Sequence, residues 1–282
     1  MSASQESRLA SIPDHSHIEK LGIFAGGGAL PRLLYQYCLD QEIEPVVIGF
    51  QAHAHPEHFN AEHYIESKIA TSGSILKNLK ARDVRYAVFV GSIERPSLLS
   101  MIPDWTTLHF FLTKGIWAKG DNAILIAAKK FLYQKAGITL HGVHQFLPNL
   151  LMPEGCVSKA QYTDFKRDID VGLKASQELG QADIGQAVLV KNGHVIGRED
   201  KKGTNTLIRR YGEEGAVLVK TCKPQQDLDL DLPTIGIKTV EQSVEAKLAG
   251  IVAHAEKSLF LDQEEAIKLA NENNLFITGA QL

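Results

Sequence analysis

The segment CKPQQDLDLDLPTIG gathers the side chains best suited to chemistry. Its aspartates, Asp227, Asp229 and Asp231, alternate with leucines, as in a strand that turns its carboxylates to water. Like charges on one face repel, so a cation could also gather them, and carboxylate oxygens suit magnesium rather than zinc. The strand interpretation is favoured for Asp227 and Asp229. Asp231 differs, because Pro233 and Gly236 fix its surroundings.

Three further polar clusters lie in apolar or glycine-rich contexts, where a surface loop would not need them. They are Lys119-Gly120-Asp121-Asn122, Asp183-Ile184-Gly185-Gln186, and Glu199 with Gly203-Thr204-Asn205. In the third, Thr204 or Asn205 would cap the helix TLIRRYG, and the N–H groups of its first turn would form an anion site. Each cluster is a weak signal by itself, and no Ser, His and Asp arrangement for nucleophilic catalysis is readable.

The stretch GIFAGGGALPRLL joins an apolar strand to a helix through Gly26, Gly27 and Gly28. A dinucleotide-binding turn needs a third spaced glycine and an acidic residue at the end of the next strand. Here Pro31 takes the third position and the next strand ends IGFQAH, so an NAD site is disfavoured. No Gly-Lys-Ser/Thr follows, so the turn is not a P-loop. Two alternatives stay open: a phosphate site built from backbone N–H groups, or a plain tight turn.

The first half of the chain must hold these residues through alternating strands and helices. The apolar runs KLGIFA, EPVVIGF and RYAVFVG are separated by helical segments, which predicts βαβ units and a parallel sheet. Ligands of such sheets bind beyond the carboxyl ends of the strands, so AGGGALP and VGSIERPSLL are the ends that matter. A helix is expected from about Asp121 to Ala136, with Gly137 as its stop.

The second half reads as mixed α/β with antiparallel pairing. A helix is expected over TDFKRDIDVGLKASQELG, and Asn192-Gly193 predicts a two-residue hairpin. Further strands are expected in GAVLVK, TIGIKTV, AGIVAHAEKSLFL and LFITGA, with a helix beginning near Asp262 and Glu265. We therefore predict a polar tail over 1–18, a Rossmann-like N-terminal domain over 19–138, and a mixed α/β C-terminal catalytic domain over 142–282.

Composition excludes several classes of protein. The chain has 282 residues, 44% of them hydrophobic, a formal net charge of -3 and a pI of about 6.4. It has no basic excess for nucleic acid, no apolar run long enough to span a membrane and no signal peptide, so a cytoplasmic protein is expected. Its three cysteines form neither a disulfide framework nor a metal motif. Four histidines in QAHAHPEHFNAEHY are read as a polar loop rather than a zinc site.

Taken together, the motifs resemble the LpxI-type UDP-2,3-diacylglucosamine pyrophosphatases of the lipid A pathway. The resemblance begins near Lys20, runs to the C-terminus and is carried by GIFAGGGALP, GSIERPSLL, KGDNAIL, HGVHQFLPNLLMPEG, DIGQAVLV, GTNTLIRR and KPQQDLDLDLPTIGI. It implies a two-domain enzyme with its substrate in the crevice between the domains. It also implies hydrolysis to UMP and 2,3-diacylglucosamine 1-phosphate with a divalent metal, usually Mg²⁺.

The resemblance also implies roles for individual residues. The aspartate of DLPTIG, here Asp231, is the family's catalytic acidic residue, and we expect it to hold the metal or position the attacking water. Glu199 is our candidate for a second catalytic carboxylate. Residues expected to contact the substrate are Gly26, Gly27, Gly28, Asp121, Asn122, Gln186, Gly203, Thr204, Asn205, Lys223 and Gln226. A transient contact with the inner membrane surface is expected, and a homodimer stays open.

Two departures from the family pattern support a competing hypothesis. Where the family usually has Gly-Asp-Asp this chain has Gly-Asp121-Asn122, and where it has Gly-Thr-Asp this chain has Gly-Thr204-Asn205. Each change removes a carboxylate and would weaken a metal site at that position. The alternative is therefore a non-catalytic nucleotide-sugar-binding homologue. The apolar segment WTTLHFFLTKGIW could line a groove for acyl chains, although core packing is favoured.

Overall fold

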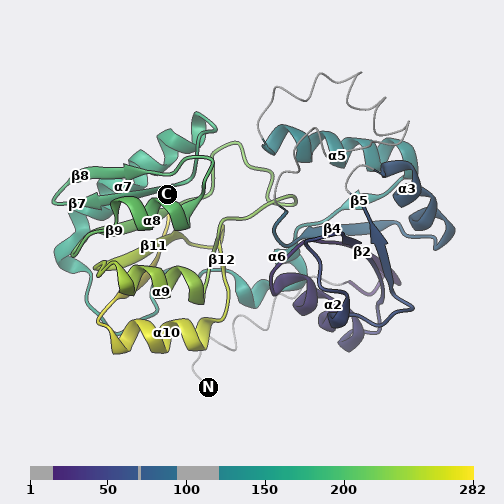
Figure 1. The fold of residues 1–282 in the computed structure, drawn as a ribbon, viewed down its shortest axis with the longest axis horizontal. Helices are drawn as coiled ribbons and strands as arrows, with labels where there is room; N and C mark the ends of the chain where they lie inside the picture. Colours follow the sequence, from purple (N-terminus) through teal and green to yellow (C-terminus); the bar gives the residue numbers. More distant parts are fainter. Residues whose placement is uncertain (1–14, 69–70, 94–120) are drawn as a thin grey trace. The chain divides into compact units, whose positions relative to one another are not determined.

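A computed structural model describes residues 15–68, 71–93 and 121–282, with only the helical backbone given for 121–123. The chain forms two compact units (Figure 1). The first runs to Pro148 and also includes Asp227–Asp231, and the second comprises Asn149–Gln226 and Leu232–Leu282. The division therefore falls after the expected boundary at 138–142. It does so because the short strand and helix that follow residue 138 belong to the first unit.

The first unit is built on a parallel sheet with strand order β3-β2-β1-β4-β5. Its strands are β1 (Lys20–Ala25), β2 (Glu44–Phe50), β3 (Tyr64–Ser67), β4 (Tyr86–Val90) and β5 (Thr139–Leu140). Parallel pairing buries both faces, and β1 and β2 are accordingly apolar after their first residues, Lys20 and Glu44. The chain reverses its direction of strand addition at β1 and β4. The carboxyl ends of these two strands therefore form the switch point at which such sheets bind ligands.

Helices cover both faces of this sheet (Figure 1). They are α2 (Leu30–Asp40), α3 (Ser72–Ala81), α5 (Asp121–Ala136) and the short α6 (Val143–Phe146). Leu34 and Cys38 of α2 are fully buried, while Leu79 of α3 and Leu132 of α5 pack into a core with Val46 and other strand residues. The helix expected over 121–136 is confirmed, and the chain leaves it through Gly137 with a φ of +69°.

The second unit contains a six-stranded mixed sheet with order β6-β13-β11-β9-β7-β8. Its strands are β6 (Gly155–Cys156), β7 (Ala187–Lys191), β8 (His194–Arg198), β9 (Val217–Lys220), β11 (Gly250–His254) and β13 (Phe276–Ala280). Strands β9, β11 and β13 are parallel, whereas β7 runs antiparallel to β8 and β9. The predicted hairpin is confirmed: Asn192 and Gly193 have φ of 53° and 76°, and both N–H groups donate to Asp168.

Alternate residues of these strands face two different cores. On one face lies α7 (Lys166–Gln181), and on the other lie α8 (Thr204–Tyr211), α9 (Ile237–Glu245) and α10 (Gln263–Glu272) (Figure 1). Val188 and Val219 pack on the α7 side, while the neighbouring residues Leu189 and Leu218 pack on the other. A separate pair, β10 (Thr234–Ile235) and β12 (Leu259–Phe260), completes the unit. The sequence TIGIKTV is therefore strand only at its start and turns into α9.

The expected strand over Asp227 and Asp229 is wrong, because this segment folds as a turn. The N–H groups of Leu230 and Asp231 both donate to the Asp227 carbonyl, at 3.0 and 3.3 Å. Leu230 is 4% exposed and joins the core of the first unit with Leu132 and Leu140. The alternation of Asp and Leu thus reflects one leucine anchored in a core rather than a pleated strand.

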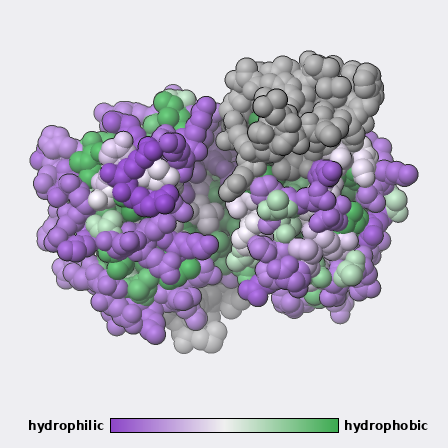
Figure 2. All heavy atoms as spheres, viewed as in Figure 1, coloured by the Kyte–Doolittle hydropathy of each residue, from purple (hydrophilic) through white to green (hydrophobic). Residues whose placement is uncertain are grey.

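The surface seen in Figure 2 is largely hydrophilic, with small scattered hydrophobic areas. Among the described helices, none has the length and apolar character needed to cross a membrane. Large exposed apolar side chains occur singly, for example Tyr133 and Ile184. Scattered residues of this kind are normal for a globular surface and indicate no interface by themselves.

Candidate functional site

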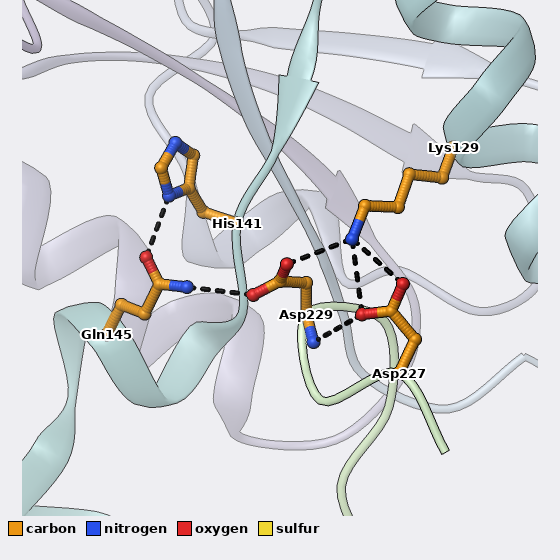
Figure 3. Close-up of polar contacts among 5 residues, drawn as sticks. All are labelled: Lys129, His141, Gln145, Asp227 and Asp229. Carbon is orange, nitrogen blue, oxygen red and sulfur yellow. Dashed lines mark hydrogen bonds and ion pairs between the residues drawn. The ribbon is translucent and has the colours of Figure 1, made fainter. Parts of the chain in front are cut away.

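The turn at Asp227–Asp231, called here the aspartate turn, is held by Lys129 of α5. The ammonium group of Lys129 contacts the carboxylates of Asp227 and Asp229 (Figure 3). Its Nζ lies 2.8 and 3.2 Å from the two oxygens of Asp227 and 2.9 Å from Oδ2 of Asp229. The side chains of Lys129, Asp227 and Asp229 are 29%, 30% and 33% exposed. Because the three side chains are partly buried, water screens the attraction between their charges less than it does in a fully exposed ion pair.

A second anchor for Asp229 is Gln145 of α6, which is itself held by His141 directly after β5. Gln145 Nε2 donates to Asp229 Oδ1 at 2.8 Å, and Gln145 Oε1 lies 2.7 Å from His141 Nδ1 (Figure 3). Since the carboxylate accepts from the amide nitrogen, the amide oxygen must accept from His141, which places the imidazole proton on Nδ1. The buried Nε2 of His141 then needs no acceptor, in agreement with its lack of a partner in the described structure.

Burial and ion pairing shift the pKa values of Lys129 and His144, two groups around the turn. Partial burial lowers the pKa of Lys129, but its hydrogen bonds to Asp227 and Asp229 outweigh this and leave the pKa raised. Lys129 is therefore a cation at every physiological pH. Burial lowers the pKa of the nearby His144, which the charge of Asp229 opposes only in part. His144 is accordingly neutral at pH 7.

Asp231 ends the turn with an exposed side chain, directly after the buried Leu230 and before the buried Leu232. The backbone beyond it is firmly held: Pro233 O accepts from Leu259 N at 2.8 Å, and Thr234 O accepts from Lys220 Nζ at 3.0 Å. Asp231 is thus an exposed residue between two buried leucines, at the point where the chain passes from the first unit to the second. Of the three aspartates in the turn, Asp231 is the most exposed.

The glycine turn after β1 packs directly against the end of β4. Gly26 N donates to Val90 O at 2.8 Å, and Gly27 exchanges two hydrogen bonds with Ser92. A Cβ on Gly26 would lie 2.5 Å from Ser92 O, and one on Gly91 would lie 2.6 Å from Gly27 O. The glycines therefore allow two backbones to touch, and the N–H groups of Gly26 and Gly27 are already engaged. Gly28, exposed and with a φ of +93°, is the glycine left open.

Glu199, our second candidate carboxylate, is 7% exposed and has both oxygens engaged. Oε1 accepts from the Thr204 hydroxyl at 2.6 Å, and Oε2 accepts from Gln186 N at 2.8 Å. The predicted cap at Thr204 or Asn205 is wrong: Gly203, with a φ of +79°, is the N-cap of α8, and the Thr204 hydroxyl turns to Glu199 instead. The structure thus brings Gln186, Glu199 and Thr204 together as one hydrogen-bonded group, in which Glu199 and Thr204 are buried.

Comparisons with known proteins agree with this two-unit architecture. Residues 20–150 match the family model described as LpxI N-terminal domain, and residues 153–278 match that described as LpxI C-terminal domain. The chain belongs to the LpxI family. A relative from Caulobacter vibrioides, UDP-2,3-diacylglucosamine pyrophosphatase LpxI, is 32% identical over an aligned length of 279 residues. The match covers 93% of this chain and 98% of that protein. The family is thus matched in both units.

Other residues implied by the LpxI resemblance occupy the second unit. Lys223 Nζ pairs with Asp183 at 2.6 Å, and Lys223 N donates to Gln226 Oε1 at 3.1 Å. The ammonium expected to meet a phosphate is therefore already paired with a carboxylate. Asn205 is exposed in the first turn of α8.

Several expected residues of the LpxI pattern cannot be placed here. The side chains of Asp121 and Asn122 lie outside the described residues, as do most of GSIERPSLL and the whole stretch from Trp105 to Trp117. Conversely, sequence reasoning missed Lys129 and Gln145. The signal that could have found Lys129 is the pair Lys129-Lys130 within the otherwise apolar stretch AILIAAKKFL.

Proposed function

We propose that this protein hydrolyses the pyrophosphate bond of UDP-2,3-diacylglucosamine, giving UMP and 2,3-diacylglucosamine 1-phosphate for lipid A synthesis. The observation that carries the proposal is the match to both LpxI domains, together with a near full-length relative named for this activity. The exposed side chain of Asp231, whose N–H donates to the Asp227 carbonyl, supports it at the level of the site.

We further propose that the reaction uses Mg²⁺. Within residues 15–68, 71–93 and 121–282 there is no group of three His, Cys, Asp or Glu side chains that could hold a metal. Asp227 and Asp229 are occupied by Lys129, which leaves Asp231 as the acidic side chain of the turn that is exposed. Mg²⁺ is often held by one or two carboxylates together with substrate phosphates, and this donor set fits that arrangement. When bound, the ion would neutralise charge on the phosphoryl oxygens.

The remaining roles belong to the chain's own residues. Asp231 would accept a proton from the attacking water or orient that water through a hydrogen bond. Gly28, at the amino end of α2 and beside the switch point of the sheet, would offer its backbone N–H to a phosphate oxygen. Glu199 has no oxygen free of hydrogen bonds, so we assign it to holding Gln186 and the Gly203 turn rather than to contact with the water.

The acyl chains of such a substrate would be embedded in a membrane. We therefore propose that the protein contacts the inner membrane surface transiently while it is otherwise cytoplasmic. A sedimentation assay with vesicles that contain the substrate would test this. Binding that persists without substrate would point to a stable peripheral protein instead.

The decisive experiment is UMP release by the purified protein, followed with added Mg²⁺ and with EDTA. We expect turnover that EDTA abolishes and Mg²⁺ restores. Turnover that persists in EDTA would overturn the metal requirement but keep the hydrolysis. Tight binding of the UDP-sugar lipid without release of UMP would instead favour a non-catalytic nucleotide-sugar-binding homologue. The neutral residues Asn122 and Asn205, which replace carboxylates of the family pattern, support that alternative.

A further inference from the structure

We propose that Lys129 is a positioning residue for Asp231, acting through Asp227 and Asp229 rather than on the substrate. The inference rests on the proposed hydrolysis and adds a residue from a distant part of the chain. Lys129 is separated from Asp227 and Asp229 by 98 and 100 positions, yet contacts both carboxylates within 2.9 Å. The turn that carries Asp231 is thus fastened to α5 by one ammonium group.

The charge balance of the turn requires such a cation. Three carboxylates occur within five residues, and two of them converge on one point at which Lys129 lies (Figure 3). Without the ammonium, Asp227 and Asp229 would repel one another, and the turn could not keep both side chains in place. The uncompensated charges would also repel a pyrophosphate that approaches Asp231. Lys129 therefore allows an acidic turn to meet an anionic substrate.

The hydrogen bonds show how the position of Lys129 is transmitted. Asp227 Oδ1 accepts from Asp229 N at 3.1 Å, and the Asp227 carbonyl accepts from the N–H groups of Leu230 and Asp231. Asp227 therefore binds Lys129 through its carboxylate and closes the turn through its backbone carbonyl. Leu230 fixes the other side by its burial in the core. A small shift of a catalytic group can lower a rate by about 100-fold, so loss of this grip should reach Asp231.

The test compares Lys129→Met with Lys129→Arg and with Lys130→Met. Lys130 is the exposed neighbour on the same helix and serves as the matched control. For Lys129→Met we expect kcat to fall by about 10- to 100-fold while KM changes by less than about threefold. Lys129→Arg, which keeps the charge and can reach two carboxylates, should restore kcat to within about fivefold. Lys130→Met should behave as wild type.

A readout independent of turnover separates this inference from the proposed function. Hydrogen exchange of the amides of Leu230 and Asp231 should quicken in Lys129→Met and stay protected in Lys130→Met. A wild-type protein that releases no UMP would refute the hydrolysis, and the exchange data would still decide whether Lys129 holds the turn. A Lys129→Met enzyme with unchanged kcat and unchanged exchange would overturn the inference.

If Lys129→Met fails to fold, Asp227→Asn removes one of its two partners and keeps the side-chain size. We expect that variant to lose kcat and amide protection to a smaller extent. In Asp227→Asn, adding Lys129→Arg should change kcat less than it does in the wild-type background, since the partner is already weakened. Full additivity of the two changes would show that Lys129 does not act through Asp227.

Discussion

The two carboxylates that the sequence singles out, Asp231 and Glu199, have opposite environments. Asp231 is exposed on a turn that other residues hold, whereas Glu199 is 7% exposed and accepts hydrogen bonds on both oxygens. A ligand in solution can reach the exposed side chain, whereas contact with the buried one would require the loss of a hydrogen bond. The contrast teaches that a carboxylate in a loop between two elements can have two distinct uses. The burial of the side chain decides between them.

Of the substitutions that test this comparison, Asp231→Ala should have the largest effect, a loss of turnover. Because an exposed carboxylate contributes little to folding, we expect the variant to fold, to keep its melting temperature and to bind the UDP-sugar lipid. Its kcat should fall by about 10²- to 10⁴-fold, as on removal of a group that handles a proton. UMP release and calorimetry measure the two properties. Wild-type turnover by this variant would refute the assignment of Asp231.

Gly26→Ala should have the second largest effect. The glycine turn of the first unit shows a similar contrast, between Gly26, which packs against Ser92, and Gly28, which has open space around it. The new Cβ of Gly26→Ala would lie 2.5 Å from the backbone oxygen of Ser92, so we expect a loss of about 1–3 kcal/mol of stability or more. Gly28→Ala is the matched control: its Cβ meets nothing within 4 Å, and only its φ of +93° adds strain. Thermal unfolding of both variants should show the larger drop for Gly26→Ala.

Glu199→Ala should lower stability rather than chemistry alone. It leaves the Thr204 hydroxyl and the Gln186 N–H without their acceptor, at about 1–3 kcal/mol. Glu199→Gln keeps one acceptor oxygen and should recover part of this loss. Chemical unfolding gives the free energies. If Glu199→Gln instead abolished UMP release with unchanged stability, Glu199 would be a catalytic group and the contrast with Asp231 would be wrong.

The smallest expected effect is a pH dependence in the second unit, where His254 is 5% exposed. Burial, helped by Lys257, lowers the pKa of His254 from 6.5 to about 4. Between these values the unfolded chain binds the proton and the folded chain does not, so stability should fall as the pH drops from 6.5 toward 4. Melting temperatures across this range test it. His254→Gln should flatten the curve, and an unchanged slope would contradict the assignment.

Local signals in the sequence predicted much of the fold. Alternating apolar runs gave the parallel sheet, and Asn192-Gly193 gave the hairpin, because strand pairing and turn chemistry depend on neighbouring residues. The turn at Asp227 was misread as a strand, since a period of two does not reveal that Leu230 fills the core of the other half of the chain. Lys129 was missed for the same reason, because its partners lie about a hundred positions away.

The roles of the individual glycines could not be read from the sequence either. Three in a row indicate a tight turn or a phosphate site, and both need backbone without side chains. Only the contact with Ser92 shows that Gly26 and Gly27 serve backbone packing, with their N–H groups already used. Similarly, Thr204 is well suited to cap a helix, but its hydroxyl is taken by Glu199, which is not a local neighbour in the helix.

The return of residues 227–231 to the first unit limits how the chain can be divided. A fragment that ends at Pro148 would lack Leu230, leaving a hole in its core and an unpaired ammonium at Lys129. We therefore expect chimaeras of two relatives to fold only where residues 227–231 and the first unit come from the same parent. Substitutions in residues 227–231 and in α5 should accordingly depend on one another, although about a hundred residues separate the two segments.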